Sequence, residues 1–413
     1  MVSLFFVSNN IFNIMGSAQV ASASQSADIK LVFSDKQAQS SKASDIFVVN
    51  GTDGNGKGIN ELISLMKVSG LSFYGENNSS GIIGKDDIVI IKVNSQWDER
   101  GGTNTDLVKS LVQTIVDHPQ GFLGEVVIAD NGQAQYGSTG SGGSLSYARN
   151  NAKDISQSIQ KVADSFSSYK VSTYQWDNIT NEMVNEYSER DLKDGYVVEG
   201  SPDPETGLVV TYPKFKTKYG TNVSFKLGVW DSANETYDSH RLKVINVPVL
   251  KSHGIYGVTA SVKHYMGVAS DRLSRTMGGR AHNSVGSGGM GTEMAQTRLP
   301  ALNIIDAIWV NANPGHGPST TYGDATHTGV IAASTDPIAL DYWAAKNILM
   351  PTARARGYGD LSSIDPDNGS PGSFGDWLKH SMEEIRKAGY WATTDDESMN
   401  IYIASANAKK STN

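Results

Sequence analysis

Two groups of basic side chains interrupt the apolar stretch VPVLKSHGIYGVTASVKHYMG at residues 247–267. Lys251 and His253 end its first apolar run, and Lys263 follows ten residues after His253. Ammonium groups beside free backbone N–H groups favour a carboxylate, a phosphate or a similar oxyanion. Imidazole titrates near neutral pH, so His253 could also transfer a proton. The stretch predicts an anion site. The alternative is that the lysines pair with acids and the histidines cap or pack.

The expected strands put further polar side chains beside these groups. Lys92 and Asn94 end the β-branched run DDIVIIKVN, and Asp130 ends GEVVIAD. In a parallel sheet the carboxyl ends of the strands meet at the edge where ligands bind, so we expect these residues to converge with Lys251. A lysine at the end of an apolar strand needs a charged partner, and Asp130 is our candidate.

The residues after the turn predict a short helix that begins at Thr259 and runs through TASVKHYMG. Thr259 and Lys263 are four residues apart and would share one face of that helix. His264 is rotated away by about 100°. We therefore expect Thr259 and Lys263 to contact the anion, and we expect His264 to have a structural role.

Three acids further along the chain, Asp306, Asp336 and Asp341, are candidate general bases, and the first two are also candidate ligand-binding groups. Asp306 lies in IIDAI, and Asp336 precedes Pro337 at the start of DPIALDYWAAKNIL. A simpler interpretation of Asp336 is the N-cap of a helix, because Asp followed by Pro is typical of a helix start.

The order of apolar patterns predicts an α/β fold with a mostly parallel sheet, flanking helices and an inserted α+β elaboration. We divide the chain into a first α/β half at residues 24–137, an insertion with its own small sheet at 138–240, and a second half with the site at 241–350. A C-terminal helix and strand follow at 351–413.

The composition bounds the function classes. The net charge is −8, which argues against nucleic acid as a partner. There is no cysteine, so the chain itself cannot bind an iron–sulfur cluster through thiolates, and we expect no cofactor. Residues 1–23 are typical of an export signal, which predicts an extracellular or cell-surface location. No later apolar run is long enough to predict a membrane span.

Several motifs resemble, in order, the family catalogued as domain of unknown function 362. They include NVPVLKSH, with Asn246 and Lys251, then GVTASVKHYMG, GGRAH with His282, and the segment from LNIIDAIWV to DPIALD. The resemblance implies that Asn246 and His282 belong to the site. Two positions depart from the family pattern, since Val93 replaces a proline and His264 replaces an asparagine. Many members resemble iron–sulfur proteins through a ferredoxin-like module, and because this sequence has no cysteine we do not expect that module in it.

Three functions are consistent with these residues. The first is an exported protein whose cleft binds a small oxyanion, with His253, His282 or Lys263 carrying out a proton-transfer or hydrolytic step. The second is a non-catalytic extracellular binding or surface-structural protein. The third is a metal-dependent enzyme that uses His282 with His316 or His327. The spacing of these histidines is not compact, and our prediction of site residues includes no metal.

Overall fold

The computed structural model describes residues 30–32, 42–75, 81–133, 144–274 and 279–407. The expected export signal at residues 1–23 and the expected start of the insertion at residue 138 lie outside the described residues.

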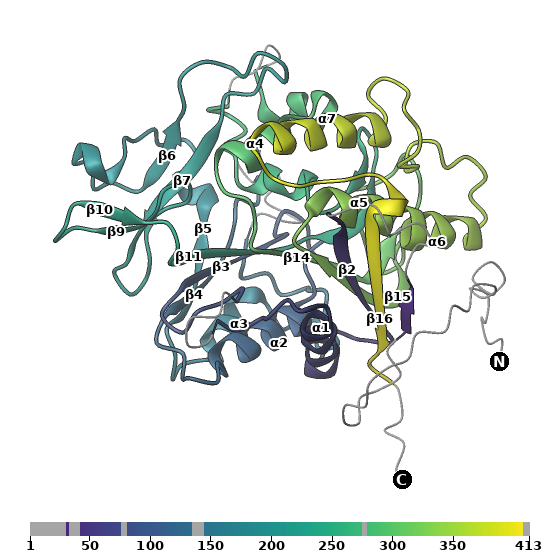
Figure 1. Cartoon of the computed structure of the whole chain (residues 1–413), viewed down its shortest axis with the longest axis horizontal. Helices are drawn as coiled ribbons and strands as arrows, with labels where there is room; N and C mark the ends of the chain where they lie inside the picture. The colour runs from purple at the N-terminus through teal and green to yellow at the C-terminus, as the bar shows by residue number, and fades with distance from the viewer. Residues whose placement is uncertain (1–29, 33–41, 76–80, 134–143, 275–278, 408–413) are drawn as a thin grey trace, which may run out of the picture.

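A sheet of eleven strands forms the centre of the described structure (Figure 1). Along the sheet the order is β1-β16-β2-β15-β14-β11-β3-β4-β5, and β12 joins β14 and carries β13. The strands are β1 (Lys30–Val32), β2 (Ser44–Asn50), β3 (Ile88–Val93), β4 (Glu125–Asp130), β5 (Val171–Gln175), β11 (Leu242–Val247), β12 (Val249–His253), β13 (Gly257–Thr259), β14 (Leu302–Asn311), β15 (Thr326–Ser334) and β16 (Met399–Ser405).

Most neighbouring strands of this sheet are parallel, which confirms the predicted fold class. The pairs β3–β4, β4–β5, β11–β3, β11–β14, β12–β14 and β16–β2 are parallel. Strand β15 is antiparallel to both neighbours, and so are β1 to β16 and β12 to β13. All six residues of β3, IVIIKV, are buried, as expected for a strand covered on both faces.

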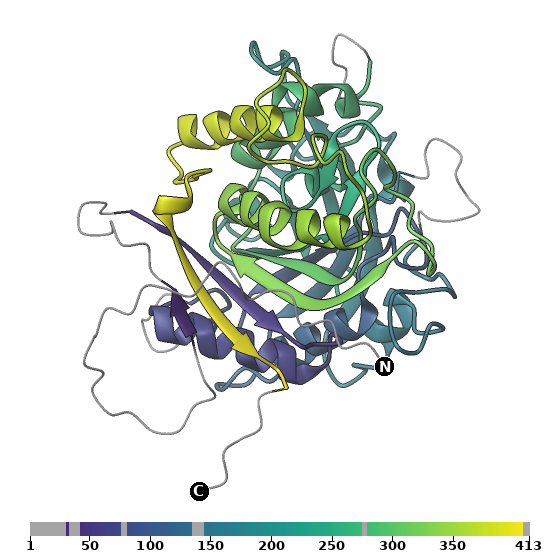
Figure 2. The ribbon, with the colours of Figure 1, turned by 90° about the vertical axis from the view of Figure 1, so that its right-hand side faces the viewer.

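Helices cover both faces of the sheet (Figures 1 and 2). On one face lie α1 (Gly56–Ser69), α2 (Thr105–Val116) and α3 (Ile159–Asp164), and on the other lie α4 (Gly289–Gln296), α5 (Pro337–Ala344), α6 (Met350–Ala355) and α7 (Phe374–Lys387). Side chains alternate along a strand, so β3 serves both cores. Val89 packs in the cluster that includes Leu111 of α2, and Ile90 in the cluster that includes Trp377 of α7.

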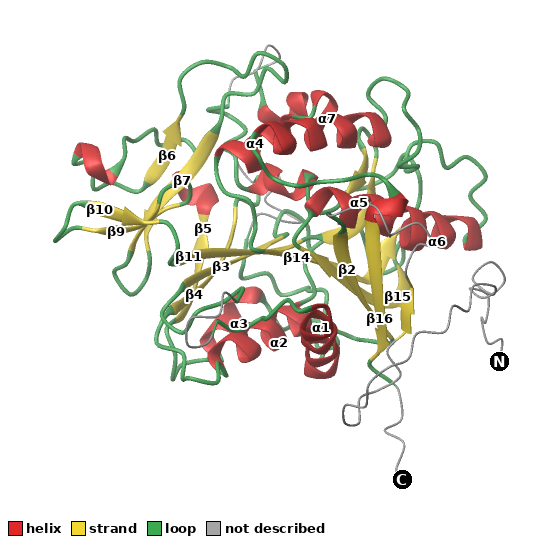
Figure 3. Ribbon diagram, in the orientation of Figure 1, coloured by secondary structure: helices red, strands yellow, loops and turns green. Residues whose placement is uncertain are grey.

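A second, antiparallel sheet lies beside the main one (Figure 3). Its strands are β6 (Gly195–Val198), β7 (Thr211–Lys216), β8 (Asn222–Ser224), β9 (Gly228–Asp231) and β10 (Thr236–Asp238). All five fall within residues 138–240, where we expected a small sheet. The same segment also supplies β5 to the main sheet and α3 to its helical layer, so it is not purely an insertion.

The segment after the turn differs from the expected helix. Residues Gly257–Thr259 form strand β13, and only Lys263–Gly267 are helical, as the 3-10 helix η4. The prediction that a helix begins at Thr259 is therefore wrong. The backbone of Thr259 pairs with that of Lys251 across a hairpin, and the β-branched pair Val258 and Thr259 suits a strand.

The remaining short elements complete the described chain. They are η2 (Trp176–Ile179), η3 (Tyr187–Glu189), η5 (Ala281–Ser287), the π-helix η6 (Ala345–Leu349) and η7 (Asp396–Ser398). Among the described residues, no helix is both long and apolar enough to cross a membrane.

Candidate functional site

Six of the predicted site residues line one small cavity where β3, β4 and β12 end. The cavity has a volume of about 30 Å³. The six are Lys92, Asn94, Asp130, Lys251, Thr259 and Lys263. Sequence-distant segments therefore meet at the edge of the sheet where we expected them.

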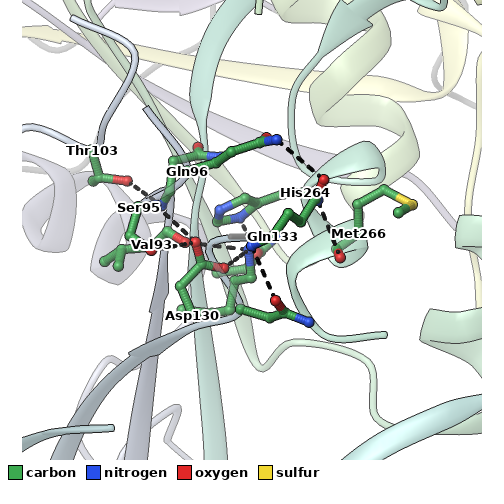
Figure 4. Close-up of polar contacts among 12 residues, drawn as sticks. Val93, Ser95, Gln96, Thr103, Asp130, Gln133, His264 and Met266 are labelled. Atoms are coloured by element: carbon green, nitrogen blue, oxygen red, sulfur yellow. Dashed lines mark hydrogen bonds and ion pairs between the residues drawn. The ribbon is translucent and has the colours of Figure 1, made fainter. Parts of the chain in front are cut away.

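Lys92 and Asp130 form a buried ion pair on neighbouring parallel strands. The Lys92 Nζ lies 2.8 Å from Asp130 Oδ1, and each side chain is 3% exposed or less. Asp130 Oδ2 accepts hydrogen bonds from the backbone N–H and the hydroxyl of Ser95, at 2.7 and 2.9 Å (Figure 4). The expectation that Asp130 is the partner of Lys92 is confirmed. Burial lowers the pKa of Lys92, and the charge of Asp130 opposes that shift.

Lys251 and Lys263 are buried lysines with no carboxylate within ion-pair distance among the described residues. The Nζ of Lys251 donates to the carbonyl oxygen of Gly101 at 2.6 Å. The Nζ of Lys263 lies 3.4 Å from Nε2 of His282. Burial lowers the pKa of each lysine to about 7, and the charge of Lys263 contributes to the lowering at Lys251.

Thr259 contributes a hydroxyl to the same cavity. It stands opposite Lys251 in the β12–β13 ladder, so both side chains reach the cavity from one hairpin. Its Oγ1 is buried and has no hydrogen-bond partner among the described residues. The hairpin thus presents an ammonium group and a free hydroxyl side by side.

Two glutamines that the sequence did not single out link the loops around the cavity. Gln96 Nε2 donates to Gln133 Oε1 at 3.3 Å, and Gln133 Nε2 donates to the carbonyl oxygen of Met266 at 3.4 Å (Figure 4). All three residues line the cavity, as does Pro318. They lie on loops or on the short helix η4, where no strand or helix pattern marks a functional position.

His253 and His282 lie beside Lys263 and outside the cavity lining. The His253 Nδ1 accepts the backbone N–H groups of Ile255 and Tyr256, both at 3.2 Å, so this nitrogen is an acceptor and the neutral ring carries its proton on Nε2. The two imidazole rings are 5.5 Å apart. Burial and the nearby charge of Lys263 lower the pKa of both, that of His282 to about 3.

Asn246 lies beneath the site and has all its side-chain groups occupied. Its amide nitrogen donates to the Ser261 carbonyl oxygen at 3.0 Å and to Asn303 Oδ1 at 2.9 Å. Its Oδ1 lies 2.7 Å from His264 Nδ1. Asn246 and His264 therefore hold η4 against strand β11.

The two remaining predicted acids do not line the cavity. Asp306 accepts the backbone N–H groups of Asn104 and Ile308, at 2.8 and 3.1 Å, and burial raises its pKa to about 6. Asp336 is the N-cap of α5, since its Oδ1 accepts the N–H groups of Ile338 and Ala339. It lines a separate cavity of about 690 Å³.

The histidines of the metal hypothesis have different surroundings. His316 lines a polar cavity of about 170 Å³, and the ring of His327 packs 4.7 Å from that of Trp309. His282 lies against His253 and Tyr256. Among the described residues, no group of three or more His, Asp or Glu side chains could hold a metal ion.

The family match includes the site residues that come from the second half of the chain. Residues 231–346 match the family described as Domain of unknown function (DUF362). The resemblance to DUF362 is confirmed over this segment. The DUF362 match contains Lys251, Thr259 and Lys263, whereas Lys92 and Asp130 come from the first half of the chain.

One curated protein is similar to part of this chain. The thylakoid-associated protein sll1697 from Synechocystis sp. is 32% identical over 131 residues. Those residues are 29% of this chain and 39% of the length of the relative. No solved structure matches the chain.

Proposed function

We propose that the cavity binds a small oxyanion. The observation that carries this proposal is the burial of Lys251 and Lys263 without a carboxylate partner among the described residues. Removing an unpaired ammonium group from water costs several kcal/mol. A ligand that supplies negative charge would offset that cost, so two such groups at one cavity favour an anion.

Lys263 and His282 are the residues best placed for proton transfer within this proposal. They are 3.4 Å apart, so they can share one proton but would repel each other if both were charged. His253 instead serves as a neutral donor, because its Nδ1 already accepts two backbone N–H groups. The proposed step is thus the transfer of a proton between the Nζ of Lys263 and a bound acid. His282 would assist because its Nε2 can share this proton with Lys263.

Binding without catalysis is a second candidate, and the small size of the cavity favours it. A volume of about 30 Å³ holds one small group and leaves no enclosed space for a larger substrate. We also propose export to the cell surface or beyond, on the basis of the N-terminal sequence alone.

Charge removal tests the proposal. Lys251→Met and Lys263→Met keep much of the side-chain volume, so anion binding should weaken by about 1.5–3 kcal/mol. The ligand-free variants should not lose stability, because they no longer bury an unpaired ammonium group. Calorimetric titration with phosphate and small carboxylates measures binding, and urea melts measure the free energy of unfolding.

Lys57→Met is the matched control, because Lys57 is exposed on α1. It should change neither quantity by more than about 0.5 kcal/mol. A loss of about 3–5 kcal/mol of stability in the cavity variants, with no anion binding by the parent protein, would mean that the lysines are structural partners of acids.

A further inference from the structure

The size of the cavity limits the ligand that the proposed anion site can take. A water molecule needs about 10–15 Å³ of such space, so 30 Å³ admits about two oxygen-sized groups. A carboxylate presents two oxygens in a plane. Phosphate and sulfate are tetrahedral with four, and both would have to displace the surrounding side chains.

Several hydrogen-bonding groups at the cavity have no acceptor among the described residues, or have donors left over. Lys251 uses one of its three N–H donors on Gly101. The Nζ of Lys263 lies beside Nε2 of His282 and 5.7 Å from the centre of the Tyr256 ring. The hydroxyl of Thr259 is buried without a partner among the described residues. These three donors match a group with several acceptor lone pairs and no hydrogen of its own, as in an ionised carboxylate.

The charges around the cavity match a single negative charge. Lys92 and Asp130 neutralise each other as an ion pair. Burial lowers the pKa of Lys251 and of Lys263 to about 7, so near neutral pH the two together carry less than two full charges. The other titratable groups nearby are His253, His264 and His282, which have lowered pKa values, Asp306, whose pKa is raised, and Asp271, whose charge favours the protonated form of Lys263. Asp271 is itself paired with Arg280. A monoanion balances this arrangement better than a dianion.

We infer that the ligand of this cavity is a monocarboxylate, whose two oxygens accept from Lys251, Lys263 and Thr259. The inference rests on the proposed anion site and adds the class of ligand.

A competition of simple anions against the full chain tests this inference. Calorimetric titrations at pH 7 compare acetate and propionate with sulfate, phosphate and chloride. We expect the carboxylates to bind with Kd values at least tenfold lower than those of the other three. Thr259→Val removes one hydroxyl at nearly constant volume, so it should raise the Kd for acetate about tenfold. Thr236→Val, at an exposed position of β10, should leave that Kd unchanged.

The possible results distinguish a failure of the carboxylate inference from a failure of the proposed anion site. Sulfate, phosphate or chloride binding as tightly as acetate would overturn the carboxylate inference and leave the anion site intact. An unchanged Kd for acetate in Thr259→Val would also overturn it, because the acid would then bind elsewhere. No binding of any of the five anions by the parent protein would overturn the anion site itself.

Discussion

Asp130 neutralises one of the lysines that line the cavity and leaves the other two without an ion-pair partner among the described residues. It lines the cavity together with Lys92, Lys251 and Lys263, so one carboxylate faces three lysines. Both of its oxygens are already in use, Oδ1 by Lys92 and Oδ2 by Ser95. Asp130 therefore holds Lys92 in place and is not an ion-pair partner of the other two lysines.

Gly267 leaves the space that this ion pair occupies. A Cβ atom at position 267 would overlap both Asp130 Oδ1 and Lys92 Nζ. We predict that Gly267→Ala separates the pair and lowers the free energy of unfolding by about 3–5 kcal/mol, the cost of breaking a buried ion pair. Urea melts measure the loss.

Gly56→Ala is the control for this substitution. Position 56 is the first residue of α1, and a Cβ atom there would meet nothing within 4 Å. Its stability should stay within about 1 kcal/mol of the parent or rise, because alanine is the better helix former. Equal effects of the two substitutions would show that the fit around Gly267 is looser than the structure indicates.

At the scale of elements, helix α5 fixes the segment that carries Lys263. Asp341 of α5 accepts the backbone N–H groups of Ser261 and Val262, at 2.7 and 2.8 Å. Asp341 is fully buried, and burial raises its pKa to about 7. The link joins the hairpin β12–β13 and η4 to a helix that begins more than seventy residues later in the chain.

We predict that Asp341→Leu destabilises the protein by about 2–5 kcal/mol, because two buried N–H groups lose their acceptor. Acetate binding should weaken as well, since Lys263 follows directly after these groups. Asp341→Asn keeps one acceptor oxygen and should lose less of both. Asp86→Leu, at an exposed position, serves as the control. Intact binding in Asp341→Leu at full stability would show that the contact does not position Lys263.

The sequence predicts elements better than it predicts contacts. The buried β-branched run of β3 identifies a parallel strand, and its end places Lys92 at the ligand edge. The pairing of Thr259 with Lys251 depends on a hairpin that local patterns do not reveal. Gln96 and Gln133 reach the cavity from loops, whose course follows from tertiary contacts and not from periodicity.

The same limit applies to residues inside strands. The family resemblance predicts Asn246 as a site residue, and Asp306 is a candidate because it is an acid within an apolar run. The structure instead gives both of them neighbouring backbone or side-chain groups as partners. A buried polar group needs such partners wherever it lies, so its presence in a strand does not tell a ligand contact from an internal one.

At the scale of the whole molecule, the cavity is a basic site in an acidic protein. The chain has a net charge of −8, so its overall field opposes the approach of an anion. Anion binding at the proposed site would therefore depend on the local ammonium groups. Because these ammonium groups are buried, their protonation is linked to folding, so the free energy of unfolding depends on pH.

This coupling predicts how stability depends on pH. The folded pKa of Lys251 and of Lys263 is about 7, well below the usual value of 10.5. Between pH 7 and 10.5 the unfolded chain therefore binds more protons than the folded one, so these lysines make stability rise with pH across that window. The stability that they contribute is complete above 10.5 and is lost as the pH falls towards 7. Each lysine accounts for about 1.4 kcal/mol per pH unit in the middle of the window.

Urea melts of the ligand-free protein at pH 7.5, 8.5 and 9.5 measure this rise. Lys263→Met removes one of the two titrating groups, so the difference between the parent and the variant isolates its share from that of other ionisable residues. Saturating acetate should flatten the rise in the parent, because a bound anion favours the charged form of the lysines in the folded state. If the free energy of unfolding of the parent and of Lys263→Met changed with pH in parallel, the pKa of Lys263 could not be lowered in the folded state. Such a result would also contradict the proposal that the charge of Lys263 is unpaired until an anion binds.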